Sequence, residues 1–430
     1  MQFSPFAHQY VSGLGRSLFF ACLSAYASFA IATDWPTIIQ QAVATDPRIL
    51  SAKSLVQARQ EEVKGAYAVY LPVISGNGSL GDVKNDDPLV RQGNKQTIGL
   101  DIQQPLPLFG REKTQVALAK TAKYQEELEL SLVQQQVTAE ILEALLTLQS
   151  SQRKSLLFQQ QLNVVQQQVR ALEEAIAGGG AKLTDLRLLQ MQTSQLKARV
   201  MQQQTEYLAA KMRVERLLPE FQVPQLIQDD ILQAWQTTLP QQMTELLTQQ
   251  NDVLIIQKAQ AHVQQAEQES ALAKAELWPR FSINAQYQRG KFGEAPATSN
   301  SVFLGLEAPL YQGGQGQGRF KSANYRYDAA KETLSQEKKA YEQRVTEEWT
   351  QWQGLKQILM TWNESQTQAM ENVKLVDIQM KEGAATILDM LKAQESVLET
   401  RLQGADYALQ ERMAVVRLLQ ELNLLSNTTH

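Results

Sequence analysis

The sequence predicts a mainly helical fold with a smaller β part, built from a strand pair and a long helical hairpin that occur twice. The first observation is the motif GGAKLTDLRLLQ at 179–190, which returns about 204 residues later as GAATILDMLKAQ at 383–394. The second is a long tract before each copy, with apolar residues three and four positions apart. The third is that alternating apolar and polar segments precede each tract.

Residues 1–32 have the layout of a secretory signal peptide. Arg16 precedes an apolar run that ends in Ala30-Ile31-Ala32, and cleavage there would leave a mature chain that starts at Thr33. An acylated lipoprotein at Cys22 is the alternative, although the apolar run continues past this cysteine. The run is also shorter than the ~20 residues of a helical membrane span. Since Cys22 is the only cysteine, the mature chain would contain no disulfide.

Two repeats are expected in the mature chain, over residues 33–230 and 231–426, with a tail at 427–430. In the first, the tract 112–177 contains no proline, and at 1.5 Å per residue its helix would be about 100 Å long. Its coiled-coil seam comprises Leu162, Val165, Val169, Leu172 and Ile176. A wider stripe precedes it, formed by Leu130, Val133, Val137, Ile141, Leu145 and Leu148.

Glycines end both long helices. Gly178, Gly179 and Gly180 stop the first, and a second helix begins at Lys182 or Thr184 and continues to the residue before Pro219. The hairpin therefore covers about 111–218. In the second repeat a hairpin over about 319–425 turns at Gly383.

Four strands are expected, at about 71–82, 95–106, 279–290 and 301–310. The segments 97–103 and 281–288 alternate most regularly, so that Ile98, Leu100 and Ile102 oppose Asp101. Phe281, Ile283 and Tyr287 likewise oppose Asn284 and Gln286. Polar, glycine-containing loops over 81–94 and 290–300 should join the strands of each pair.

Strands with one apolar and one polar face suit a membrane β-barrel with a wet lumen in an exported protein. The alternative is a small soluble sheet at the end of a helical rod, and four such strands alone do not separate the two. Because four strands cannot close a barrel, a membrane barrel would have to be shared between chains.

The order of these features resembles that of the TolC-like outer membrane efflux proteins. The likeness rests on the strand entries Leu71-Pro72 and Trp278-Pro279, the strand exits 107–110 and 309–313, and the two glycine turns, and it covers about 34–425. It implies a homotrimer whose twelve-stranded outer-membrane β-barrel is continuous with a periplasmic α-helical tunnel. It also implies outer-membrane lipid around the barrel, a periplasmic adaptor protein, and an inner-membrane transporter of the ABC, RND or a similar class.

The resemblance also implies site residues. The adaptor would touch the turns at Gly178, Gly179, Gly180, Gly383 and Ala384. Asp389 would line the tunnel constriction, with Asp185 and Thr184 at the matching tip of the first repeat. Three copies of Asp389 around one axis would repel one another, raise their pKa values and attract cations. The simpler interpretation is that each aspartate only stabilises a helix N-terminus through the helix dipole.

Some positions depart from the family pattern. Lys392 replaces a second acidic residue and could pair with Asp389 at i,i+3. Met380 and Ala385 stand where an aromatic and a basic residue help to lock some members closed, so that lock is not expected here. The run Gly178 to Gly180 is more permissive than the usual apolar-flanked glycine of the tip, which puts the adaptor contact at this turn in question.

The sequence gives little indication of a catalytic function. The net charge of -4 is too small to indicate nucleic acid as a partner. Only His8, His262 and His430 are present, and no metal spacing, phosphate loop or nucleophile elbow occurs. We therefore expect no enzyme, cofactor or metal. The rival function is a periplasmic coiled-coil structural or adaptor protein, and within the channel class type I protein secretion, multidrug efflux and metal efflux remain open.

Overall fold

The computed structural model describes residues 34–83, 93–237, 239, 242–243, 250–292 and 295–425. The chain divides into two units, Met1–Asp34 and Trp35–His430, and the fold below is that of the second. The expected signal peptide at 1–32, its cleavage point before Thr33 and the tail at 427–430 lie outside the described residues.

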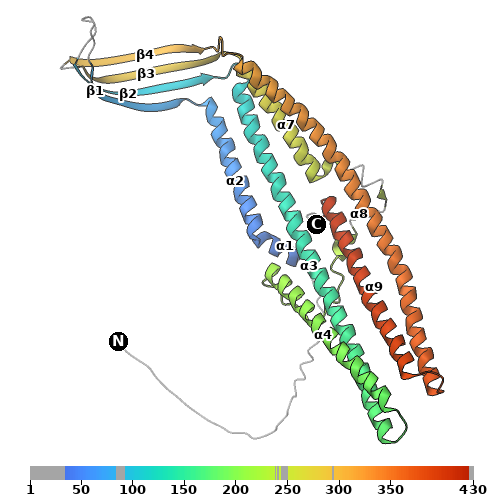
Figure 1. Ribbon diagram of the computed structural model, residues 1–430. Coiled ribbons are helices and arrows are strands. Elements are labelled where there is room, and N and C mark those ends of the chain that lie inside the picture. Colours follow the sequence, from blue (N-terminus) through green and yellow to red (C-terminus); the bar gives the residue numbers. More distant parts are fainter. Residues whose placement is uncertain are drawn as a thin grey trace, which may run out of the picture. The chain divides into compact units, whose positions relative to one another are not determined.

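Both halves of the second unit contain strands followed by a long helical hairpin (Figure 1). The first half contains α1 (Trp35–Thr45), α2 (Pro47–Tyr67), η1 (Ala68–Tyr70), β1 (Val73–Val83), β2 (Gly93–Leu106), α3 (Arg111–Ala177) and α4 (Leu183–Leu217). The second contains α5 (Gln233–Gln236), η2 (Gln250–Asp252), α7 (Leu254–Ala275), β3 (Arg280–Phe292), β4 (Ala295–Glu307), α8 (Gln315–Lys381) and α9 (Ile387–Glu421). Helices α3 and α8 each have 67 residues, and α4 and α9 each have 35.

The four strands form one antiparallel sheet in the order β1-β2-β3-β4. Strand β2 of the first half pairs with β3 of the second, with Leu100 opposite Tyr287 and Leu106 opposite Phe281. The two halves therefore share a single sheet, and β1 and β4 form its edges.

The strands extend further into their connections than predicted. Residues 290–300 were expected to form a loop, but Gly290 pairs with Ala297 and Tyr287 with Asn300. The fourth strand is Ala295–Glu307 rather than 301–310. In the first pair, 81–83 already pair with 93–95, and 84–92 lie outside the described residues. Backbone pairing continues through polar residues because the ladder needs only N–H and C=O groups.

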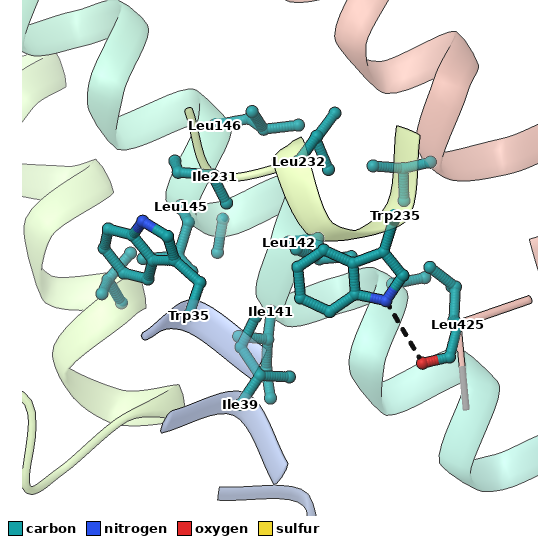
Figure 2. Packing of buried hydrophobic residues seen from close by; sticks show 14 of the residues in the cluster. Trp35, Ile39, Ile141, Leu142, Leu145, Leu146, Ile231, Leu232, Trp235 and Leu425 are labelled. Atoms are coloured by element: carbon teal, nitrogen blue, oxygen red, sulfur yellow. Dashed lines mark hydrogen bonds between the residues drawn. The ribbon is translucent and has the colours of Figure 1, made fainter. Parts of the chain in front are cut away.

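The principal core lies midway along α3 and joins segments that are far apart in sequence (Figure 2). Trp35 and Ile39 of α1 meet α3 and the segment around α5 there. Trp235 donates its indole N–H to the carbonyl oxygen of Leu425 at 3.4 Å. The stripe predicted on α3 is confirmed, since Val137, Ile141, Leu145 and Leu148 belong to this core and Leu130 and Val133 pack against it.

Two buried glutamines of α3 hold the connection between the two halves. The Gln149 side chain donates to the carbonyls of Ile227 and Asp229, each at 3.1 Å. Gln152 accepts from the Ile227 N–H at 2.9 Å. Arg412 of α9 then donates to the Gln149 side-chain oxygen at 2.8 Å. The Ile227 N–H and the carbonyls of Ile227 and Asp229 are thus satisfied by side chains of α3 rather than by a strand or helix.

Candidate functional site

The two hairpin turns have the same backbone hydrogen bonds. In the first, the N–H groups of Gly180 and Gly179 donate to the carbonyls of Ala175 (2.8 Å) and Ile176 (2.9 Å). In the second, Ala384 and Gly383 donate in the same pattern to Gln379 (2.8 Å) and Met380 (3.1 Å). This is the Schellman arrangement, which needs a left-handed residue after the helix C-cap.

Only one glycine per turn meets that requirement. Gly179 has φ 78° and Gly383 has φ 74°, a conformation that side chains with a Cβ disfavour. Gly178 has φ −86° and is the C-cap of α3, a position that Glu382 occupies at the end of α8. The additional glycines of the first turn are therefore not required by its backbone.

Asp389 closes a capping box at the start of α9. The Thr386 hydroxyl accepts from the Asp389 N–H at 3.3 Å, and the Asp389 carboxylate accepts from the Thr386 N–H at 2.9 Å and from its hydroxyl at 2.6 Å. Hydrogen bonds from Thr386 lower the pKa of Asp389, and the positive charge of Lys392 lowers it further. Among the described residues, Asp389 and Lys392 form no ion pair within 4.0 Å, so Lys392 acts through space.

Asp185 lies in a different environment at the start of α4. The N-cap there is Lys182, which makes no side-chain capping bond, and helix α4 begins at Leu183. The Asp185 N–H bonds the Lys182 carbonyl at 3.2 Å, and Thr184 is the second helical residue. The two turns are thus alike in backbone and unlike in their caps.

Thr386 was not singled out from the sequence. The signal was present, because a threonine three residues before an acidic residue and ahead of an apolar helix is the pattern of a capping box. The equivalent position in the first repeat is Lys182, so the capping-box pattern is absent from the first repeat and does not show up when the two repeats are aligned.

One apolar cluster holds both helix starts against α3. It contains Leu189 and Leu196 of α4, Leu391 and Leu398 of α9, and Val165 of α3, and Leu162, Val169 and Leu172 of the predicted seam pack against it. Arg199 of α4 also approaches Glu395 of α9 at 3.7 Å. Asp185 and Asp389 therefore lie on two helices that are positioned by the same stretch of α3.

The far ends of the long helices meet the sheet, whose two faces differ in chemistry. Cross-strand register places Ile102 beside Ala285 and Leu304 beside Ile283 on one face. Large side chains on this face are exposed, for example Ile98 at 72% and Leu304 at 64%. The other exposed members are Ile74, Leu80, Leu100, Ile102, Ile283, Tyr287, Val302 and Leu306.

The opposite face carries a polar network. Asn77 donates to Asp101 at 2.7 Å, the hydroxyls of Ser79 and Thr97 lie 2.6 Å apart, and Gln288 donates to Thr97 at 3.1 Å. Asn284 and Gln286 share this face, as the alternation predicted. The sheet therefore leaves an apolar face uncovered, while several polar side chains of its other face hydrogen-bond one another.

None of the described helices is both long and apolar enough to cross a bilayer. Within the same described ranges, no three or more His, Cys, Asp or Glu side chains are grouped so as to hold a metal ion.

Comparisons with known proteins place this fold in a family. The model of the outer membrane efflux protein family matches residues 38–218 and 247–424. A comparison with curated protein sequences gives no significant match. The chain belongs to the outer membrane efflux protein family, whose members are channel proteins rather than enzymes.

Solved structures of such channels share the fold at low sequence identity. CusC has a TM-score of 0.80 at 18% identity, over 90% of this chain and 91% of CusC. The outer membrane protein VceC of Vibrio cholerae has a TM-score of 0.77 at 18% identity, over 90% and 96%. The open MtrE channel of Neisseria gonorrhoeae has a TM-score of 0.76 at 15% identity, over 90% and 88%. The protein is accordingly an outer-membrane efflux protein that extends into the periplasm.

Proposed function

We propose that three copies of this chain form an outer-membrane channel-tunnel that exports substrates from the cell. Each copy would contribute four strands to a twelve-stranded barrel, and the helical hairpins would extend it as a tunnel through the periplasm. The family assignment favours this channel over a coiled-coil rod or adaptor.

The amphipathic, open-edged sheet carries the proposal. Its exposed apolar face suits contact with outer-membrane lipid, and its polar face suits a water-filled lumen. Strands of 11 to 14 residues are long enough to cross a bilayer when tilted. Edge strands β1 and β4 are long, and pairing with neighbouring copies would remove both edges.

The long helices support the tunnel part of the proposal. Each is 67 residues long and would extend about 100 Å between the sheet and its glycine turn. The turns are then the parts of the chain farthest from the membrane. There a periplasmic adaptor would contact Gly178, Gly179, Gly180, Gly383 and Ala384, and an inner-membrane ABC, RND or similar transporter would supply type I secretion or multidrug substrates.

Asp389 is our candidate for the gate of the tunnel. It is exposed, and the capping box holds its carboxylate at the start of α9. Three copies around one axis would repel one another, which raises their pKa values against the lowering effect of Thr386. Asp185 and Thr184 would take the equivalent place on α4.

Planar-bilayer recording tests the gate. Asp389→Ala should raise conductance and weaken block by multivalent cations, because three like charges leave the narrowest point. Lys392→Ala should strengthen cation block, since the ring loses the compensating charge. If both variants conduct and are blocked like the parent, Asp389 is a capping residue only and the constriction lies elsewhere.

A further inference from the structure

A cavity of roughly 360 Å³ lies where the polar face of the sheet meets the helices. The cross-strand row Pro105, Ser282 and Gly305 forms one wall. The start of α3 and the connection that follows α7 form the other, through Arg111, Glu112, Gln115 and Trp278. This volume falls within the range of small-molecule pockets.

Three aromatic rings, those of Phe109, Trp278 and Phe281, line the cavity beside aliphatic side chains. Phe109 and Trp278 stack with their centroids 5.3 Å apart and their planes 15° apart. Both side chains are nevertheless about half exposed, Phe109 at 42% and Trp278 at 52%. The Phe109 ring also lies 6.3 Å from that of Phe281, centroid to centroid, so Trp278, which lines the cavity and is half exposed, is the ring best placed to stack on a further planar group.

Charges of both signs surround these rings. Arg280 and Glu307 are cross-strand partners on the polar face, and both line the cavity. Within the described part of the chain, Arg280, Glu307 and Glu112 form no ion pair within 4.0 Å. Arg111 is held by Glu276 at 3.8 Å. The charges of these two arginines and two glutamates therefore sum to zero. Of the four side chains, only Arg111 forms an ion pair with another described residue.

We propose that this cavity is a binding subsite for a planar aromatic solute that carries both a positive and a negative charge. The ring of the solute stacks on Trp278, its anion is bound by Arg280, and its cation is bound by Glu307 or Glu112. A simple ion leaves the aromatic wall unused. An uncharged apolar solute would displace water from the charged side chains and offer them no hydrogen bonds in return, which is unfavourable.

The position of the subsite gives it a role in transport, and that role rests on the proposed function. If the polar face lines the lumen, the cavity opens onto the conduit at the junction of barrel and tunnel. A solute that leaves the helical part then meets a site where it dwells before it enters the barrel.

Equilibrium dialysis of the purified full-length protein in detergent tests the site. The probe is norfloxacin, a bicyclic aromatic zwitterion, and glycine betaine serves as a zwitterion without a ring. We expect saturable binding of norfloxacin at one site per chain and none of betaine. Trp278→Leu should weaken norfloxacin binding by about tenfold, as expected for the loss of one stacking partner. Arg280→Gln and Glu307→Gln should each weaken it as well.

The matched control is Tyr325→Leu, which removes an exposed aromatic ring on α8 outside the cavity and should leave binding unchanged. The charge variants keep the inference testable if Trp278→Leu does not fold. Absence of saturable binding by the parent, or equal binding by all variants, overturns the inference. Planar-bilayer conductance separates the two proposals: a parent that conducts but does not bind overturns the subsite alone, and one that binds but does not conduct overturns the channel alone.

Discussion

At the scale of single residues, the two turns share a backbone and differ in their caps. Gly179 and Gly383 each supply the left-handed conformation that a Schellman turn needs. Thr386 then closes a capping box with Asp389, whereas Lys182 makes no side-chain cap at the matching position. The start of α9 is therefore better satisfied than the start of α4, and Asp389 is held more firmly than Asp185.

Thr386→Ala should loosen the first turn of α9. It removes the acceptor of the Asp389 N–H and one donor to the Asp389 carboxylate, and losing an N-cap threonine costs about 1 kcal/mol of helix stability. Hydrogen exchange of the amides at 387–390 should accelerate. Lys182→Ala is the matched control and should leave the amides at 183–186 unchanged, because Lys182 provides no cap. Equal effects of the two substitutions would contradict the asymmetry.

The sequence predicts the turn glycines but not the contacts around them. A glycine at the end of a long apolar pattern marks a helix C-terminus through backbone sterics alone, which is a local effect. The buried glutamines Gln149 and Gln152 could not be predicted in this way. Their partners lie more than 70 residues away along the chain, and nothing local distinguishes them from the many exposed glutamines of the same helix.

At the scale of elements, the sheet combines two surfaces that require different surroundings. Register places Ile283 on the exposed apolar face and Asn284, one residue later, on the polar face. Neighbouring residues of one strand should therefore respond oppositely to a charge. Because Ile283 and Asn284 are adjacent, substitutions at these two positions compare the two faces of the sheet at nearly the same place along the strand.

Ile283→Arg should cost about 2–4 kcal/mol near the bilayer midplane, because the charge would face lipid. The same change at Asn284 should be tolerated, since this side chain would face the water-filled lumen. The measurement is the fraction of each variant that assembles into heat-modifiable outer-membrane species on a denaturing gel. If assembly is equally sensitive at both positions, the strands do not lie in a membrane.

Gln149→Leu should detach the connection between the two halves from α3. The substitution leaves the Ile227 and Asp229 carbonyls without their donor and removes the acceptor of Arg412. Buried groups left unsatisfied cost about 1–3 kcal/mol each, so the midpoint of denaturant unfolding should fall clearly. The control is Gln136→Leu, the same change at an exposed position of α3, which should leave the midpoint nearly unchanged.

The elements themselves are predicted unevenly by the sequence. The long helices follow from their apolar stripes and glycine stops, and their observed bounds lie within a few residues of those expected. The start of β4 was missed because residues 295–300 contain no large apolar side chain. That segment is a strand through its pairing with β3, which is a tertiary effect.

At the scale of the whole molecule, duplication explains the equal lengths of the two hairpins. Two copies of one unit place their turns at the same distance from one shared sheet, with α9 packed on α3. The sheet is nevertheless incomplete by itself, because β1 and β4 are open edges and one face is apolar and exposed. Further copies of the chain are the partners that would complete it.

Disulfide cross-linking between the sheet edges tests this central claim most directly. Cys22 is the only cysteine and lies in the expected signal peptide. Disulfides in the mature chain would therefore form only between introduced cysteines. One cysteine replaces Asn77 in β1, and a second is placed in turn at Ser299, Ser301 or Phe303 in β4. Strands β1 and β4 are at opposite edges of one sheet, so a bond between them must join two chains. We predict, for at least one pair, an oxidised ladder in outer-membrane fractions that stops at three chains; single chains alone with every pair would contradict the shared barrel.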